Sequence, residues 1–67
     1  MRNPDRTHDF CNTFATLWAK ELPDWRFGQL ISNFFGWIYS EKKIDPFFPE
    51  EDKMLELFKE FLGVKEN

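Results

Sequence analysis

The longest uncharged stretch of the chain, from Phe27 to Ser40, constrains the fold more than any other feature of the sequence. Its apolar residues recur every three or four positions, which predicts a helix with one apolar face: Phe27, Leu30, Ile31, Phe34, Trp37 and Ile38. Phe35 and Tyr39 widen this face to roughly 200° of the helix circumference, because successive residues turn by about 100°. An ordinary surface helix has an apolar stripe of about 100° or somewhat more. This helix therefore needs unusually extensive cover.

Prolines divide the chain into three segments with helical spacing, predicted at about 4–22, 24–43 and 49–62. Asn3 and Asp24 are the expected N-caps of the first two, because such side-chain oxygens accept hydrogen bonds from free backbone N–H groups. The third begins at Pro49 with an acidic first turn, which complements the helix dipole, and ends before Gly63. No strand or hairpin pattern occurs. The sequence predicts one all-α domain over residues 1–67, a compact three-helix protein.

The first and third helices have narrower apolar faces than the second. Neither is wide enough to cover 200° of it, so either the turn at Phe47 and Phe48 folds back over the remainder or a second copy of the chain does. We expect the second copy, and hence a homo-oligomer. The predicted interface combines small residues at every fourth position with two flanking aromatic rings: Gly28, Ser32, Gly36, Phe35 and Tyr39. Alternatively, the small residues admit the first or third helix of the same chain at short range.

Composition excludes several classes of function. A net charge of −3 and a pI near 5.0 argue against DNA as a partner and against binding to an anionic membrane. The uncharged stretch is shorter than the roughly 20 residues that a membrane-spanning helix needs, and no signal peptide is recognised. One cysteine and one histidine supply neither a disulfide framework nor an ordinary zinc site. We expect a folded cytoplasmic protein without metal or cofactor.

The sequence offers little material for catalysis. His8 and Cys11 are three residues apart on the first helix and could form a thiolate–imidazolium pair. His8 lies well away from the apolar face, however, so no pocket around the pair is expected. The carboxylates near Glu50 and Glu51 are explained by the dipole of the third helix. We therefore predict no catalytic residues and a protein that is not an enzyme.

A polar stripe on the second helix is the best candidate for a binding site. Arg26, Gln29 and Asn33 recur along one side of the helix and offer hydrogen-bond donors and acceptors, and Trp25 beside them offers a stacking face. Such a set could bind a phosphate, a carboxylate or a partner backbone. Arg2 and Arg6 would join Arg26 if the starts of the first two helices lay together. A plain solvent-facing stripe is the alternative.

Three segments together resemble short uncharacterised proteins of Firmicutes-type bacteria and of their phages and prophages: residues 2–6, the block Pro23-Asp24-Trp25-Arg26-Phe27-Gly28-Gln29-Leu30, and residues 45–52. The resemblance implies no activity, but it implies an accessory protein that binds and blocks. We therefore expect a small interaction module that engages itself or a host protein. The alternative is a binder that sequesters a small nucleotide-like ligand at an interface lined by the polar stripe, as anti-defence sponges do.

Overall fold

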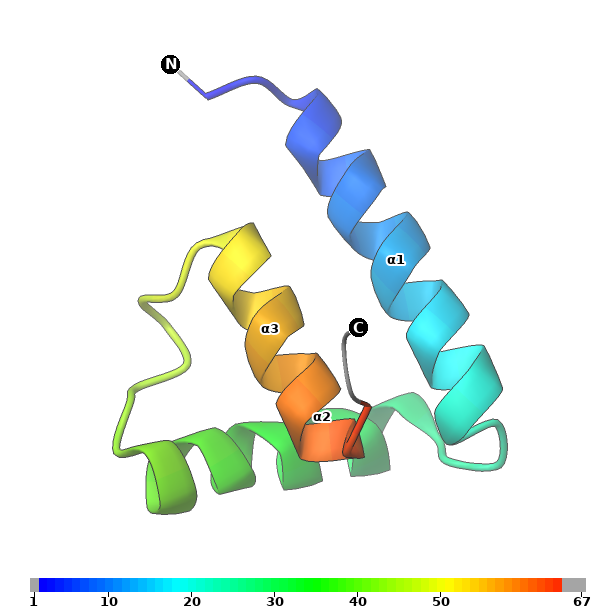
Figure 1. Ribbon diagram of the computed structural model, residues 1–67, viewed down its shortest axis with the longest axis vertical. Helices are drawn as coiled ribbons and strands as arrows, with labels where there is room; N and C mark the ends of the chain where they lie inside the picture. The colour runs from blue at the N-terminus through cyan, green and yellow to red at the C-terminus, as the bar shows by residue number, and fades with distance from the viewer. Residues whose placement is uncertain (1, 65–67) are drawn as a thin grey trace.

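The computed structural model describes residues 2–64, which form three α-helices and one wider helical turn. The elements are α1 (Asp5–Glu21), α2 (Phe27–Trp37), the π-helical turn η1 (Ile38–Lys42) and α3 (Glu51–Leu62). α1 and α3 run side by side in the same direction, and α2 crosses beneath their C-terminal ends (Figure 1). The described residues contain no strand. The predicted all-α three-helix fold is confirmed, and its Cα radius of gyration of 12.1 Å is near the ~11 Å of a compact domain this long.

The N-terminus of α1 is capped as the sequence predicts, whereas that of α2 is not. Asn3 Oδ1 accepts a hydrogen bond from the backbone N–H of Asp5 at 2.9 Å. Asp24 is not the N-cap of α2, because that helix begins three residues later, after the extended Arg26. Residues 22–25 form the connecting turn instead, and the indole N–H of Trp18 fixes it by donating to the carbonyl of Trp25 at 3.2 Å.

The second helix ends in the wider turn η1, where two backbone N–H groups donate to the same carbonyl oxygen. The oxygen of Ile38 accepts hydrogen bonds from the backbone N–H of Lys43 and from that of Ile44, the latter at 3.4 Å. This geometry places Lys43 in the left-handed region, with φ of 58°. The chain thereby reverses, and Ile44 packs against the core.

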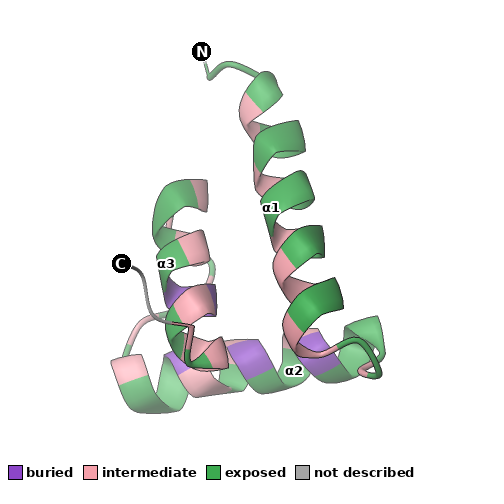
Figure 2. Cartoon of the chain, turned by 45° about the vertical axis from the view of Figure 1, so that its right-hand side comes forward, coloured by how far each residue is buried: buried purple, intermediate pink, exposed green. Residues whose placement is uncertain are grey.

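The core is small and lies on one flank of α2 (Figure 2). Its fully buried side chains are Leu30, Phe34, Ile38, Leu57 and Phe58. α1 contributes no fully buried residue, and instead its Phe14 ring stacks on the Phe58 ring at a centroid distance of 4.4 Å. A domain of this size hides only about 60% of the surface that its unfolded chain exposes, so each of these packed rings matters for stability.

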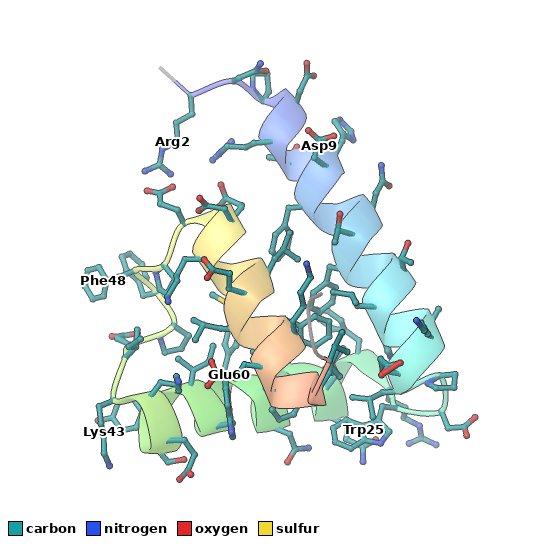
Figure 3. All side chains as sticks on the ribbon, viewed as in Figure 1. Arg2, Asp9, Trp25, Lys43, Phe48 and Glu60 are labelled. Carbon is teal, nitrogen blue, oxygen red and sulfur yellow. The ribbon has the colours of Figure 1, made fainter. Side chains whose placement is uncertain are left out.

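Ion pairs connect the N-terminal ends of α1 and α3. Arg2 pairs with Glu50 at 2.5 Å, and Arg6 Nε approaches Glu51 Oε1 to 2.8 Å without the alignment of a hydrogen bond (Figure 3). The condition under which these two arginines would join Arg26 is not met, because α1, about 25 Å long, separates its N-terminal end from the start of α2. Each partly exposed pair is worth ~1 kcal/mol or less, so the pairs mainly set the register of α1 against α3.

The left-handed backbone of Lys43 generates a stability prediction. Replacing Lys43 by glycine relieves a conformation that costs an L-residue about 1–2 kcal/mol, against about 0.5–1 kcal/mol of extra chain entropy. We expect the Lys43→Gly variant to gain up to about 1 kcal/mol in the free energy of unfolding, measured by urea denaturation. Ser40→Gly is the matched control, because exposed Ser40 lies in a helical turn and its replacement should lower stability. A loss of stability in Lys43→Gly would contradict the described turn.

Candidate interaction surface

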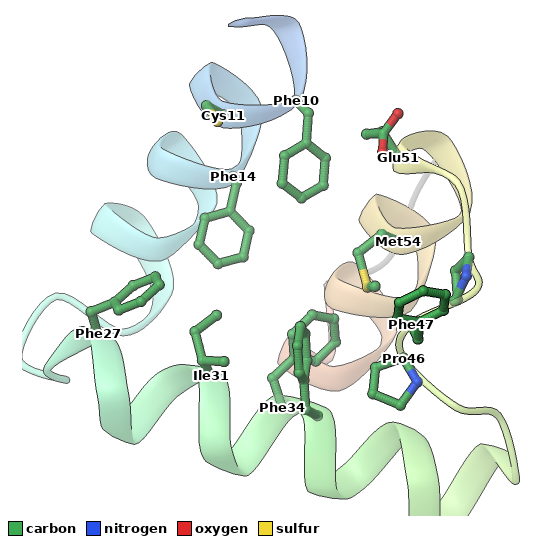
Figure 4. Close-up of a pocket in the computed structure, with 12 residues that line it drawn as sticks. Phe10, Cys11, Phe14, Phe27, Ile31, Phe34, Pro46, Phe47, Glu51 and Met54 are labelled. Atoms are coloured by element: carbon green, nitrogen blue, oxygen red, sulfur yellow. The ribbon is translucent and has the colours of Figure 1, made fainter. Parts of the chain in front are cut away.

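An apolar groove of about 490 Å³ opens between the three helices (Figure 4). α1 contributes Phe10 and Phe14 to one wall, and α3 with its preceding loop contributes Met54 and Phe47 to the other. The floor is a stripe of α2 whose members are spaced by four residues and so lie above one another on the helix: Phe27, Ile31 and Phe35. We call this feature the aromatic groove.

The aromatic groove is almost without polar character. Glu51 is the single charged residue in its lining, and its carboxylate is occupied by the ion pair with Arg6 at 2.8 Å. Cys11 is the other lining residue with reactive chemistry, and it is exposed and free. A ligand in this groove would therefore be recognised by apolar contact and shape, since none of the described residues aims a buried polar side chain into the groove.

Four large hydrophobic side chains around the second helix are exposed to solvent. The exposed fractions are 60% for Phe27, 69% for Tyr39, 83% for Phe47 and 72% for Phe48. The rings of Phe47 and Phe48 contact each other at 5.1 Å, and Phe48 points away from the helices (Figure 3). The turn that carries them borders the aromatic groove without folding back over α2, so it does not supply the missing cover.

The small residues of α2 form an uncovered ridge. No atom of the described residues lies within 4 Å of a Cβ built at Gly28 or at Gly36, apart from their immediate neighbours and the helix backbone. Ser32 between them is exposed. The alternative that these residues admit α1 or α3 at short range is therefore wrong. We call Gly28, Ser32 and Gly36 the glycine ridge; with half-buried Phe35 and exposed Tyr39 beside it, its role as an oligomer interface stays a prediction.

The residues of the predicted polar stripe separate into two environments. Arg26, Gln29 and Asn33 are exposed, and Asn33 Nδ2 donates to the backbone oxygen of Gln29 at 2.8 Å. Trp25 is half-buried and packs against the core, and its carbonyl accepts from the indole of Trp18. None of the four lines the aromatic groove. Their role in binding stays a prediction. Because Trp25 is half-buried, it does not offer the open stacking face that the sequence suggests.

Chemical sites other than the groove are poorly supported. His8 and Cys11 are both exposed, and the described residues give them no hydrogen bond to each other. No three histidine, cysteine, aspartate or glutamate side chains within residues 2–64 are grouped closely enough to hold a metal ion. Across the same residues, none of the helices has the length and apolar character required to span a bilayer.

The sequence does not predict the aromatic groove, because its walls belong to separate helices. Phe10 and Phe14 lie on α1, and Met54 lies on α3. α1 and α3 run side by side, and the groove lies between these two helices and α2 (Figure 4). The spacing of Phe27, Ile31 and Phe35 is the one feature of the sequence that could have indicated the groove. Apolar residues at this spacing extend around the helix beyond the side that two neighbouring helices can cover.

We expect substitution by alanine to change stability in opposite directions at Gly36, on the uncovered ridge, and at Gly63. Gly36→Ala should raise the free energy of unfolding by about 0.8–1 kcal/mol, because alanine is the better helix former and its Cβ meets open space. Gly63→Ala should lower it, because Gly63 ends α3 with φ of 77°. Thermal and urea unfolding in dilute solution measure both. Destabilisation by Gly36→Ala would show that part of the chain lies against the ridge.

Comparisons with known proteins leave the chain without an assigned relative. No protein-family model, no curated protein and no solved structure matched it. The described residues build a surface suited to binding. That surface is an apolar groove flanked by exposed aromatic rings and by a ridge without side-chain bulk.

Proposed function

We propose that this chain is a non-enzymatic interaction module that binds the apolar side chains of a protein surface. The observation that carries the proposal is the exposure of Phe27, Tyr39, Phe47 and Phe48 around an apolar groove. Aromatic residues are enriched in the cores of protein interfaces, and they supply many of the residues that dominate binding energy. Large contiguous apolar patches are uncommon on soluble monomers and mark interaction sites.

The chemistry of the groove favours a protein over a small polar ligand as its occupant. The carboxylate of Glu51, the one charged group among its lining residues, is already paired with Arg6. The lining therefore offers no positive charge to an anionic ligand and no unpaired negative charge to a cationic one. Phenylalanine, isoleucine and methionine side chains instead offer dispersion contacts and a hydrophobic gain of about 25 cal/mol per Å² buried. A partner helix or loop that presents apolar side chains meets these conditions.

The sequence resemblance to short phage and prophage proteins agrees with this proposal. Short phage and prophage reading frames often encode accessory proteins that bind and block rather than enzymes, and such a role needs a binding face but no catalytic residues. A host protein and a second copy of the chain are both partners of the required chemistry. We propose that the module works in the cytoplasm, where such host proteins are found.

Native mass spectrometry of the protein purified from its natural host tests this proposal. We expect a complex with another polypeptide chain that is lost in the Phe47→Ser variant, because Phe47 lines the groove and is 83% exposed. The same exposure means that the substitution should leave thermal stability nearly unchanged.

Arg26→Ala is the matched control, since Arg26 is exposed and lies outside the groove. Retention of the protein complex in this variant supports the proposal. A retained small molecule that depends on Arg26, in place of a protein, would instead favour the nucleotide-like ligand binder. A bare monomer with neither would overturn the interaction module.

A further inference from the structure

We propose that the occupant of the aromatic groove is Phe48 of a second copy of this chain, in a symmetric dimer in which the Phe48 ring of each protomer enters the groove of the other. This inference rests on the proposed function, because it names the partner that binds the same groove. Three observations support it. The chain carries both a protruding ring and a groove with room for a ring, the ring is held by an ordered turn, and the groove face has the area and the charge that self-association needs.

Phe48 is an aromatic side chain without cover in its own chain. It is 72% exposed, it points away from the helices (Figure 3), and it does not line the groove beside it. Its ring contacts that of Phe47 at a centroid distance of 5.1 Å, and Phe47 lines the groove. The protruding ring and the groove are therefore neighbours on one molecule.

The aromatic groove has room for such a ring. An apolar cavity of about 150 Å³ is large enough to bind benzene, and the groove measures about 490 Å³. Its walls include the rings of Phe10 and Phe14, and aromatic rings gain from packing against one another beyond the area that they bury. A phenylalanine ring therefore matches both the size and the chemistry of the groove.

The turn that carries Phe48 is held in place within the single chain. Asp45 Oδ1 accepts a hydrogen bond from the backbone N–H of Phe47 at 2.9 Å, and the Asp45 carbonyl accepts one from the N–H of Phe48 at 3.2 Å. Pro46 and Pro49 lie on either side of the two rings and restrict the backbone there. A side chain presented by an ordered turn loses less conformational entropy when it binds.

A single two-fold rotation satisfies both protruding rings at once. In a symmetric dimer, each contact between a residue of one protomer and a different residue of the other occurs twice, once in each direction. When the Phe48 ring of one protomer enters the groove of the second, the second protomer's Phe48 ring enters the groove of the first. No ring and no groove is then left over, so assembly stops at two chains.

The exposed area of the groove face approaches what one side of a dimer needs. The rings of Phe27 and Phe47 in the lining and of Phe48 beside it together expose the equivalent of about two complete side chains. At about 150–250 Å² for each aromatic side chain, they offer about 300–550 Å² per protomer, against the roughly 800 Å² that each partner buries in a standard interface. Half-buried apolar residues of the lining add further area: Phe10, Phe14, Ile31, Phe35, Pro46 and Met54.

The charges around the groove do not oppose self-association. The chain has a net charge of −3, so two copies need to meet through a face without net charge. Glu51 is the one charged residue of the groove lining and is paired with Arg6. Glu50, the preceding residue, is paired with Arg2. Two acidic and two basic side chains thus neutralise each other beside the groove.

Sedimentation equilibrium of the purified chain alone, at micromolar concentrations, tests the dimer. We expect a mass of two chains for the wild type. Phe48→Ser should raise the dissociation constant by about tenfold or more, because a few anchor side chains in well-packed pockets dominate the binding energy of an interface. Tyr39→Ser is the matched control. Tyr39 is exposed to a similar extent, 69%, but lies outside the groove, so its replacement should leave the dimer intact.

A mixture of two variants tests the exchange of rings itself. Cys11 is exposed and lines the groove, so Cys11→Glu should place a charge in the groove and leave Phe48 unchanged. Phe48→Ser has the opposite defect, an intact groove without a protruding ring. Each variant alone impairs both ring–groove contacts of its dimer, whereas a dimer of one with the other keeps one contact intact. We therefore expect the equimolar mixture to form more dimer than either variant alone at the same total concentration.

Alkylation of Cys11 by iodoacetamide gives a readout that needs no substitution. Cys11 is the one cysteine of the sequence and lines the groove, so a second copy seated in the groove should shield its thiol. We expect the alkylation rate of the wild type to fall as the protein concentration rises through the dissociation constant. In Phe48→Ser the rate should stay constant over the same range.

Each result decides between the proposals. The exchanged dimer is overturned by a wild-type monomer, by a mass that keeps rising beyond two chains, by equal effects of Phe48→Ser and Tyr39→Ser, or by a mixture that dimerises no better than its components. If the purified chain is a monomer but native mass spectrometry still finds a Phe47-dependent complex with another protein, the dimer is wrong and the interaction module stands. If neither assembly forms, both are wrong. Circular dichroism of every variant establishes that loss of the dimer is not loss of the fold.

Discussion

The ring of Phe58 holds the three helices together. It is fully buried on α3 and contacts Phe14 of α1 at 4.4 Å and Phe34 of α2 at 5.0 Å. No other buried ring joins all three helices within residues 2–64. Since α1 contributes no fully buried residue of its own, its attachment depends on this stack, on its other half-buried apolar residues and on the ion pairs at its N-terminal end. This stack, together with the contacts of Trp18 with Phe27 and with the Trp25 carbonyl, places α1 relative to α2.

Phe58 also determines which side of α2 is left uncovered. By drawing α1 and α3 onto the flank that carries Leu30, Phe34 and Ile38, it confines the core to that flank. Of the other apolar residues of this helix, Phe27 contacts Trp18 of α1 and Trp37 contacts Phe61 of α3, yet Phe27 stays 60% exposed. The aromatic groove forms between α1, α3 and α2, and the glycine ridge has open space around Gly28 and Gly36. One packing centre thus accounts for both surfaces.

The helices could be predicted well from the sequence, whereas the surfaces formed between them could not. Helical spacing and prolines predicted three helices, because local hydrogen bonding and the two-sided character of each helix are encoded by nearby residues. The start of α2 was wrong because the indole of Trp18 organises the turn around Trp25, a contact between residues on different elements. The aromatic groove depends on how α1, α3 and the loop before α3 are placed relative to α2, which no single helix pattern contains. The width of the apolar face, in contrast, correctly indicated that α2 would stay partly uncovered.

The small core and the exposed aromatic rings have one cause, because a single chain of this length buries few of its aromatic side chains. A chain of 67 residues has 13 aromatic side chains, yet only two of them, Phe34 and Phe58, are fully buried. Folding alone therefore leaves much of the available hydrophobic free energy unused, and the fold of the single chain has little reserve. Binding to an apolar surface would release part of that energy, and by mass action a partner that binds only the folded chain also stabilises it. Assembly and stability are coupled in such a protein, because the rings that fail to find cover within one chain are those available to a partner.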